Sequence, residues 1–234
     1  MTERPAFYAR TGSAAADLVA ILHPPYTAWH LSYVVIGASL AASVSLSRLG
    51  WTLVVFFLAV GIAAHSLDEV SSRPLKTGLG DAALWAMAIT ALGAAAVVVA
   101  LGSVLVSPWI WAWAVAGLFF AVGYPLEWPA FLHTDLGFAV AWGAFPVLVG
   151  YWVQTESVSL GAVIVAGFAT LLSLAQRSLS TPARFVRRET TAADARFDTA
   201  AWDRTRLLAT WEVPLRWLAW AVVALAAGLL VARI

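Results

Sequence analysis

Residues 64–78 read AHSLDEVSSRPLKTG and place His65, Asp68 and Glu69 at the polar end of a long apolar run. Side chains three and four positions apart share one face of an α-helix, so this spacing predicts that all three project together. Ionisable groups at the mouth of a membrane helix indicate a functional site, because the bilayer makes them costly. We therefore predict a catalytic or metal-binding centre at this point of the chain.

A second polar segment, HTD at residues 133–135, is predicted to face the first. A His and a Glu four positions apart on one helix can reach a single ion, and the facing loop would supply two more ligands. Imidazole with carboxylate suits zinc or iron, whereas carboxylates alone suit magnesium. The predicted metal ligands are His65, Asp68, Glu69, His133 and Asp135. The predicted catalytic residues are Asp68, Glu69 and Asp135.

Each of these residues also has a simpler interpretation as a solvated side chain of a loop at the membrane boundary. Two further histidines, His23 and His30, are weaker candidates. His30 follows Trp29 directly and is interpreted as an interfacial hydrogen-bonding residue rather than a ligand. The clustering on two segments is what favours a shared site.

Basic residues near these segments suggest an anionic substrate, because guanidinium pairs bidentately with phosphate oxygens. Arg73, Lys76 and Tyr26 are the predicted substrate-binding residues. For Arg73 and Lys76, phosphate binding and attraction to anionic lipid headgroups both stay open. A run of arginines at positions 177, 184, 187 and 188 could bind a diphosphate, but for residues 184–188 attraction to the membrane surface is favoured.

Composition determines the class of protein that must hold these residues. Of 234 residues, 62% are hydrophobic and 12% are charged, about half the charged share of a soluble domain. Cysteine is absent, which excludes disulfides and thiolate metal sites. We predict an all-α polytopic membrane helical bundle that forms a single transmembrane domain, residues 1–234, with no nucleic-acid partner.

Seven apolar runs are predicted to cross the bilayer. Residues 1–27 form an N-terminal interfacial segment, in which 13–22 are a short entry helix, and residues 178–212 form a polar loop before the last crossing. The predicted crossings are Ala28–Leu46, Trp51–His65, Ala82–Val104, Pro108–Tyr124, Gly137–Gln154, Leu160–Ala175 and Pro214–Ala232.

The distribution of positive charge predicts the orientation. With seven crossings, nearly all arginines and the single lysine lie on the side of the N-terminus, and only Arg48 and Arg233 lie on the other. Because cytoplasmic loops carry the excess of Lys and Arg, we predict a protein of the cytoplasmic (inner) membrane with the N-terminus in the cytoplasm and the C-terminus outside.

The acidic helix end followed by SRPLKTG resembles the UbiA-type intramembrane prenyltransferase superfamily. There, an Asp-rich motif is followed by an RPL signature, which Arg73, Pro74 and Leu75 match, and His65 and Asp68 fall near the positions of the Asn and first Asp. Residues 123–162 are similar to the middle region of the menaquinone-type branch. The resemblance implies two Asp-rich motifs that hold Mg²⁺, yet the second motif's region, LAQRSLSTPARFVRRE, has no carboxylate before Glu189.

Three functions follow as expectations. The resemblance implies a UbiA-like membrane protein that acts on an isoprenoid or other lipid, with prenyl transfer dependent on a divalent metal, Mg²⁺ or, given the histidines, zinc or iron. The missing second motif favours a non-enzymatic alternative, which binds a lipid, quinone or pigment or serves as a subunit of a complex. The histidines suggest another alternative, a metal-dependent membrane hydrolase or oxidoreductase.

Overall fold

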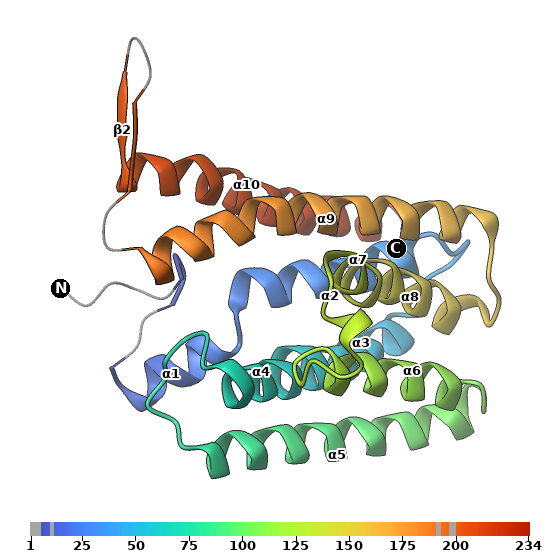
Figure 1. The fold of residues 1–234 in the computed structure, drawn as a ribbon. Helices are drawn as coiled ribbons and strands as arrows, with labels where there is room; N and C mark the ends of the chain where they lie inside the picture. Colours follow the sequence, from blue (N-terminus) through green and yellow to red (C-terminus); the bar gives the residue numbers. More distant parts are fainter. Residues whose placement is uncertain (1–5, 10–11, 191–192, 197–199) are drawn as a thin grey trace.

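A computed structural model describes residues 6–9, 12–190, 193–196 and 200–234, which form a bundle of helices (Figure 1). Two of the long helices contain a π-helical segment in mid-course. The first half of the chain comprises α1 Ala14–Ile21, α2 Pro24–Ser39, the continuous helix α3 Leu46–Phe56, η1 Phe57–Ala64 and α4 His65–Ser72, and α5 Asp81–Leu105. The second half comprises α6 Ile110–Gly123, η2 Ala130–Leu132, the continuous helix α7 Asp135–Ala139, η3 Val140–Ala144 and α8 Phe145–Thr155, α9 Leu160–Glu189, β1 Asp194–Arg196, β2 Ala201–Asp203 and α10 Arg204–Val231.

Several of these helices suit a bilayer. Within the described residues, five are long and apolar enough to cross a membrane, namely Leu46–Ser72, Asp81–Leu105, Asp135–Thr155, Leu160–Glu189 and Arg204–Val231. The apolar α6 is shorter, with 14 residues, and α2 has 16. The predicted class, a mostly helical membrane protein, is confirmed to this extent.

The first two predicted crossings have different boundaries in the structure. The first helix ends at Ser39 rather than Leu46, and Leu46 instead begins the next helix, which runs to Ser72. Its start is set by Ser45, whose hydroxyl accepts a hydrogen bond from the Arg48 backbone N–H, as an N-cap does. The second crossing is therefore long, where the sequence predicted a short one.

The predicted polar loop 178–212 is wrong for most of its length. Helix α9 continues to Glu189 and α10 begins at Arg204, so only residues 190–203, with the hairpin β1–β2, connect them (Figure 1). Pro182 and Pro214 lie inside these helices, where proline normally ends a helix. The helices continue through these positions with one face buried in the bundle, and Ala183 and Leu215 lie on that face.

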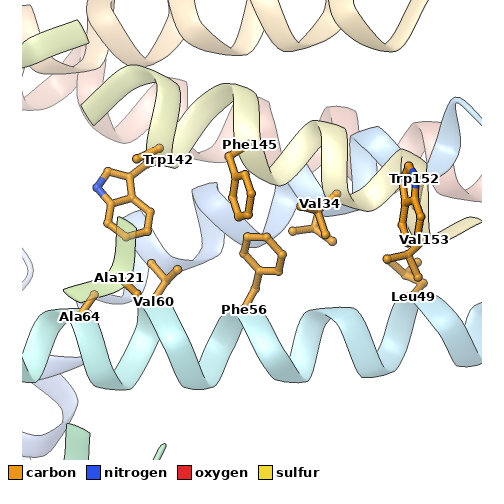
Figure 2. Packing of buried hydrophobic residues seen from close by; sticks show 13 residues of the cluster. Val34, Leu49, Phe56, Val60, Ala64, Ala121, Trp142, Phe145, Trp152 and Val153 are labelled. Atoms are coloured by element: carbon orange, nitrogen blue, oxygen red, sulfur yellow. The ribbon is translucent and has the colours of Figure 1, made fainter. Parts of the chain in front are cut away.

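The core lies between α3, η1 and the η3–α8 helix (Figure 2). Phe56 and Phe145 meet there with ring centroids 6.0 Å apart. Helices α2 and α8 approach so closely that a Cβ on Gly37 would overlap the carbonyl oxygen of Val147, and one on Gly150 would overlap that of Val34. Glycine at these two positions therefore lets the two backbones approach closely, as small residues do at membrane helix interfaces.

One end of the bundle collects the polar segments. The successive long helices alternate in direction, so the start of α2, the end of α4, the end of α9 and the start of α10 lie together (Figure 1). At the opposite end, Arg48 pairs with Glu156 at 3.3 Å and Arg233 donates to the Ser39 carbonyl at 3.0 Å. The helix order thus separates the two predicted groups of cations to opposite ends.

Candidate functional site

A cavity of about 330 Å³ opens at the polar end of the bundle, and we call it the polar cavity. The N-terminal segment, α2, η1, α4, residues 124–133, α7, η3, α9 and α10 contribute to its walls. Among the predicted site residues, Tyr26, His65, Asp68 and His133 line it, whereas Glu69, Arg73, Lys76 and Asp135 do not. The structure therefore brings together half of the set.

All four histidines of the chain line the polar cavity. His23 and His65 stack with ring centroids 4.2 Å apart and planes 17° apart. The Tyr8 hydroxyl is hydrogen-bonded to His23 Nδ1 at 2.6 Å. His23 Nε2 is buried and has no hydrogen-bond partner among the described residues. His23, judged a weak candidate from the sequence, is thus a central wall residue.

Burial determines the protonation of the Tyr8–His23 pair. Removal from water, reinforced by the nearby His65, lowers the pKa of His23 well below its ordinary value. Burial likewise raises the pKa of Tyr8 well above that of a free tyrosine. Both groups are consequently neutral at pH 7, so His23 presents an uncharged imidazole to the cavity.

The other two histidines bond to backbone carbonyls. His30 Nδ1 lies 3.0 Å from the Trp142 oxygen, and His133 Nδ1 lies 3.1 Å from the Tyr124 oxygen. His133 also stacks on the Tyr124 ring at 4.8 Å. These contacts orient the rings, and the second nitrogen of His133, Nε2, lies 3.7 Å from the Glu127 carboxylate.

The three predicted catalytic carboxylates lie in three different environments. Asp68 lines the polar cavity, and its carboxylate accepts no hydrogen bond from any described residue. Glu69 is fully buried and accepts hydrogen bonds from the Leu75 and Thr77 backbone N–H groups at 2.9 and 2.7 Å. Asp135 pairs with Arg177 at 2.8 Å. Neighbours on a helix point about 100° apart, which is why Asp68 and Glu69 diverge.

The two predicted phosphate-binding cations after α4 serve the loop itself. Arg73 pairs with Asp81 and donates to the Leu79 carbonyl at 2.7 Å. Lys76 is exposed in the loop. Neither residue reaches the polar cavity, so RPLKTG, the segment most like the UbiA-type signature, acts here as a structured turn held by Glu69.

The cations that do line the polar cavity come from α9. Arg177, Arg184, Arg187 and Arg188 all contribute to its wall. The sequence analysis favoured membrane attraction for residues 184–188 and so missed this role. Spacing contained the signal, because positions 177, 184 and 188 fall on one face of a helix. Recognising it required knowing that α9 continues past Ser178.

A second, apolar cavity of about 630 Å³ runs along the bundle between α3, η1, α5, α6 and α8. It shares two wall residues, Val60 and Trp142, with the polar cavity. Val60 lies in η1 and Trp142 in η3, the two π-helical segments. Such segments occur often at functional sites, and here both lie where a polar chamber adjoins an apolar one.

The residues present do not fit the divalent ion that the UbiA-type resemblance implies. Within the described part of the chain, no three His, Asp or Glu side chains converge to hold a metal ion. Glu69 and Asp135, two of the five predicted ligands, are engaged by the loop 75–77 and by Arg177. The polar cavity therefore has imidazoles, one uncommitted carboxylate and guanidinium groups as its reactive side chains.

Comparison with known proteins leaves the site to be interpreted from its own geometry. No protein-family model matches the chain, and no curated protein and no solved structure matches it. The resemblance to the UbiA-type superfamily consequently stays a prediction from residues 24–177.

Proposed function

We propose that this protein is an integral membrane protein that binds an amphipathic lipid with an anionic head, of the isoprenoid class. The observation that carries the proposal is that the two cavities are adjacent and share the wall residues Val60 and Trp142. A polar chamber lined by arginines would hold the head, and the apolar chamber would hold the chain. Binding sites of this kind pair a mainly apolar wall with a few polar groups that fix orientation.

The proposed placement in the membrane has seven crossings, in which α2 and α6 cross beside the five longer helices. The N-terminus and the polar cavity face the cytoplasm, and the C-terminus lies outside the inner membrane. The collection of Arg and Lys residues at the polar end supports this orientation. A reporter fused to the C-terminus, active only outside the cytoplasm, tests it.

The proposed activity is prenyl transfer to an acceptor bound in the polar cavity. The bond between the first carbon of the prenyl chain and the diphosphate oxygen breaks, and its electron pair leaves with the diphosphate. The acceptor then bonds to that carbon and loses a proton. Asp68 is the proposed proton acceptor, because it is the one predicted catalytic carboxylate that lines the cavity. Tyr26, also in the wall, is the proposed substrate contact.

Two measurements test this proposal. The purified protein is incubated with prenyl diphosphates of several chain lengths and candidate aromatic acceptors, and release of pyrophosphate is measured. In parallel, mass spectrometry identifies lipid that co-purifies from the membrane. We expect an isoprenoid or another anionic lipid in the preparation and pyrophosphate release that Asp68→Asn abolishes. Absence of both bound lipid and release would refute the proposal.

A second candidate is lipid or quinone binding without chemistry, including a role as a subunit of a larger complex. Its supporting observation is that Glu69 and Asp135 are committed to contacts within the fold. Bound lipid without pyrophosphate release from any prenyl diphosphate would favour this candidate over transfer.

A further inference from the structure

We infer that the polar cavity binds a phosphate or diphosphate head directly through Arg184 and Arg188, with no bridging divalent metal. This inference rests on the proposed function and names how its site recognises the head. It differs from what the UbiA-type resemblance implies, namely Mg²⁺ between two acidic motifs. The four arginines of α9 differ in how they are partnered.

Two of these arginines are neutralised within the fold. Arg177 pairs with Asp135 at 2.8 Å, and Arg187 pairs with Glu212, its Nε lying 2.8 Å from the carboxylate. Both ion pairs are shielded on the arginine side, whose side chains are 15% and 16% exposed. These two residues contribute to the wall of the polar cavity, but their positive charge is already compensated by the paired carboxylates.

The other two form no ion pair among the described residues, although both lie near enough to Asp68 to act on its charge at longer range. Among the described residues, no carboxylate lies within ion-pairing distance of Arg184 or Arg188. Arg184 makes one long hydrogen bond, at 3.4 Å, to the Thr181 hydroxyl. Arg188 Nε is buried and has no partner in the described part of the chain. Placing charged donors at a cavity without acceptors is costly unless a ligand supplies them.

The wall of the polar cavity includes another unpartnered group. His23 Nε2 is buried, faces no described partner and belongs to a ring held by Tyr8 and stacked on His65. If Tyr8 donates to Nδ1, the neutral ring carries its proton on Nε2 and can donate it. Guanidinium groups and an imidazole N–H in one cavity wall are donors that phosphate oxygens can accept from.

The charges also bear on why no set of His, Asp and Glu side chains converges among the described residues. A metal ion beside a diphosphate neutralises its charge, and two guanidinium groups without an ion-pair partner among the described residues supply positive charge for the same purpose. The region where the resemblance implies a second acidic motif reads LAQRSLSTPARFVRRE, and its arginines include residues 184 and 188. Arginine thus stands where acidic metal ligands would otherwise be needed.

The test measures binding of two probes, farnesyl diphosphate and inorganic pyrophosphate, to the full-length protein in detergent by calorimetry. Each titration is made once with excess EDTA and once with MgCl₂. We expect farnesyl diphosphate to bind with similar Kd in both buffers, and pyrophosphate to bind more weakly because it lacks the chain. Arg184→Gln and Arg188→Gln should each weaken binding of farnesyl diphosphate by about tenfold or more, since each removes charged hydrogen bonds.

Arg206→Gln is the matched control, because Arg206 is exposed on α10 at the same end and lies over the Trp202 ring. It should leave both Kd values unchanged. Thermal unfolding of each variant, compared with the wild type, confirms that the fold is retained. Arg188→Lys should recover part of the affinity, because it restores the charge without the bidentate geometry.

The failure modes are separable. Binding of farnesyl diphosphate that needs MgCl₂ and disappears in EDTA would overturn the metal-free inference and leave the proposed function intact. Metal-independent binding that neither arginine variant weakens would overturn the assignment to Arg184 and Arg188, and would also leave the proposed function intact. If the wild type binds neither probe in either buffer, both the inference and an anionic lipid head are wrong. Pyrophosphate binding as tight as that of farnesyl diphosphate would refute the lipid chain's role.

Discussion

Replacing Glu69 by Gln should destabilise the protein rather than disable its chemistry. The Glu69 side chain is fully buried and accepts three hydrogen bonds from the loop after α4. They come from the Leu75 N–H at 2.9 Å, the Thr77 N–H at 2.7 Å and the Thr77 hydroxyl at 3.0 Å. These bonds anchor residues 73–78, the segment that sequence analysis placed in the active centre.

The magnitude follows from the number and kind of these bonds. A hydrogen bond to a charged group contributes about 1.5–3 kcal/mol, and a neutral one about 1 kcal/mol. In Glu69→Gln an NH₂ group replaces one oxygen and faces a backbone N–H that cannot accept, so at least one bond is lost. The others change from charged to neutral acceptors. We expect a loss of about 2–4 kcal/mol in unfolding free energy, which lowers Tm by roughly 5–15 °C.

Asp68→Asn is the matched comparison at the adjacent position. The Asp68 carboxylate lines the polar cavity and has no hydrogen-bond donor among the described residues, so its replacement should leave Tm nearly unchanged. Under the proposed function it should abolish pyrophosphate release. Thermal unfolding followed by tryptophan fluorescence, with both variants in the same detergent, measures the first property, and the release assay measures the second.

The opposite pattern would refute this reasoning. If Glu69→Gln kept the wild-type Tm but lost activity, Glu69 would be catalytic, as its spacing from His65 first indicated. If Asp68→Asn lowered Tm as much as Glu69→Gln, the assignment of Asp68 to the cavity and of Glu69 to the loop would be wrong.

Three further predictions follow from burial, close packing and the apolar cavity. Because burial lowers the pKa of His23, the folded protein leaves it neutral, whereas the unfolded chain binds a proton below about pH 6.5. The free energy of unfolding should therefore fall as the pH drops below about 6.5, by up to ~1.4 kcal/mol per pH unit. In Tm measured from pH 7.5 to 5, His23→Asn should reduce that slope, and asparagine tolerates the left-handed backbone at this position. Equal slopes for the variant and the wild type would contradict the prediction. Gly37→Ala should lower the unfolding free energy by about 1–3 kcal/mol, because its Cβ would overlap the Val147 carbonyl. The control Gly93→Ala has open space around its Cβ and should leave the unfolding free energy equal or slightly higher. Similar Tm values for the two variants would show that α2 and α8 can separate at no cost. Ala96→Trp, at an exposed wall position of the apolar cavity, should weaken farnesyl diphosphate binding in calorimetry but leave pyrophosphate binding unchanged. Equal effects on both probes would exclude this cavity as the site of the prenyl chain.

Helix boundaries show where sequence reasoning reaches its limit. Apolar runs of sufficient length predicted the helices, because a span must bury its backbone polar groups in its own hydrogen bonds. The same reasoning failed at residues 178–212, where Pro182, Pro214 and many charged residues are typical of a loop. Tertiary packing of one face of α9 and of α10 against the bundle overrides those local signals.

The candidate site shows the same division at the level of single side chains. The sequence alone brought the histidines, Asp68 and Tyr26 to one end of the bundle, because helices of bilayer length alternate in direction. It did not show that the Glu69 side chain points toward the loop after α4 and accepts hydrogen bonds from it.

By itself, then, the sequence determined a helical membrane protein with its polar groups and cations segregated to one end, since hydrophobic length and charge are properties of the chain. Only the tertiary structure decided how far each helix rotates about its axis and how far α9 extends. Those two quantities place Asp68, Arg184 and Arg188 at the polar cavity and commit Glu69 and Asp135 to other partners. A rotation of one residue moves a side chain by about 100°, and only packing against neighbouring helices selects it.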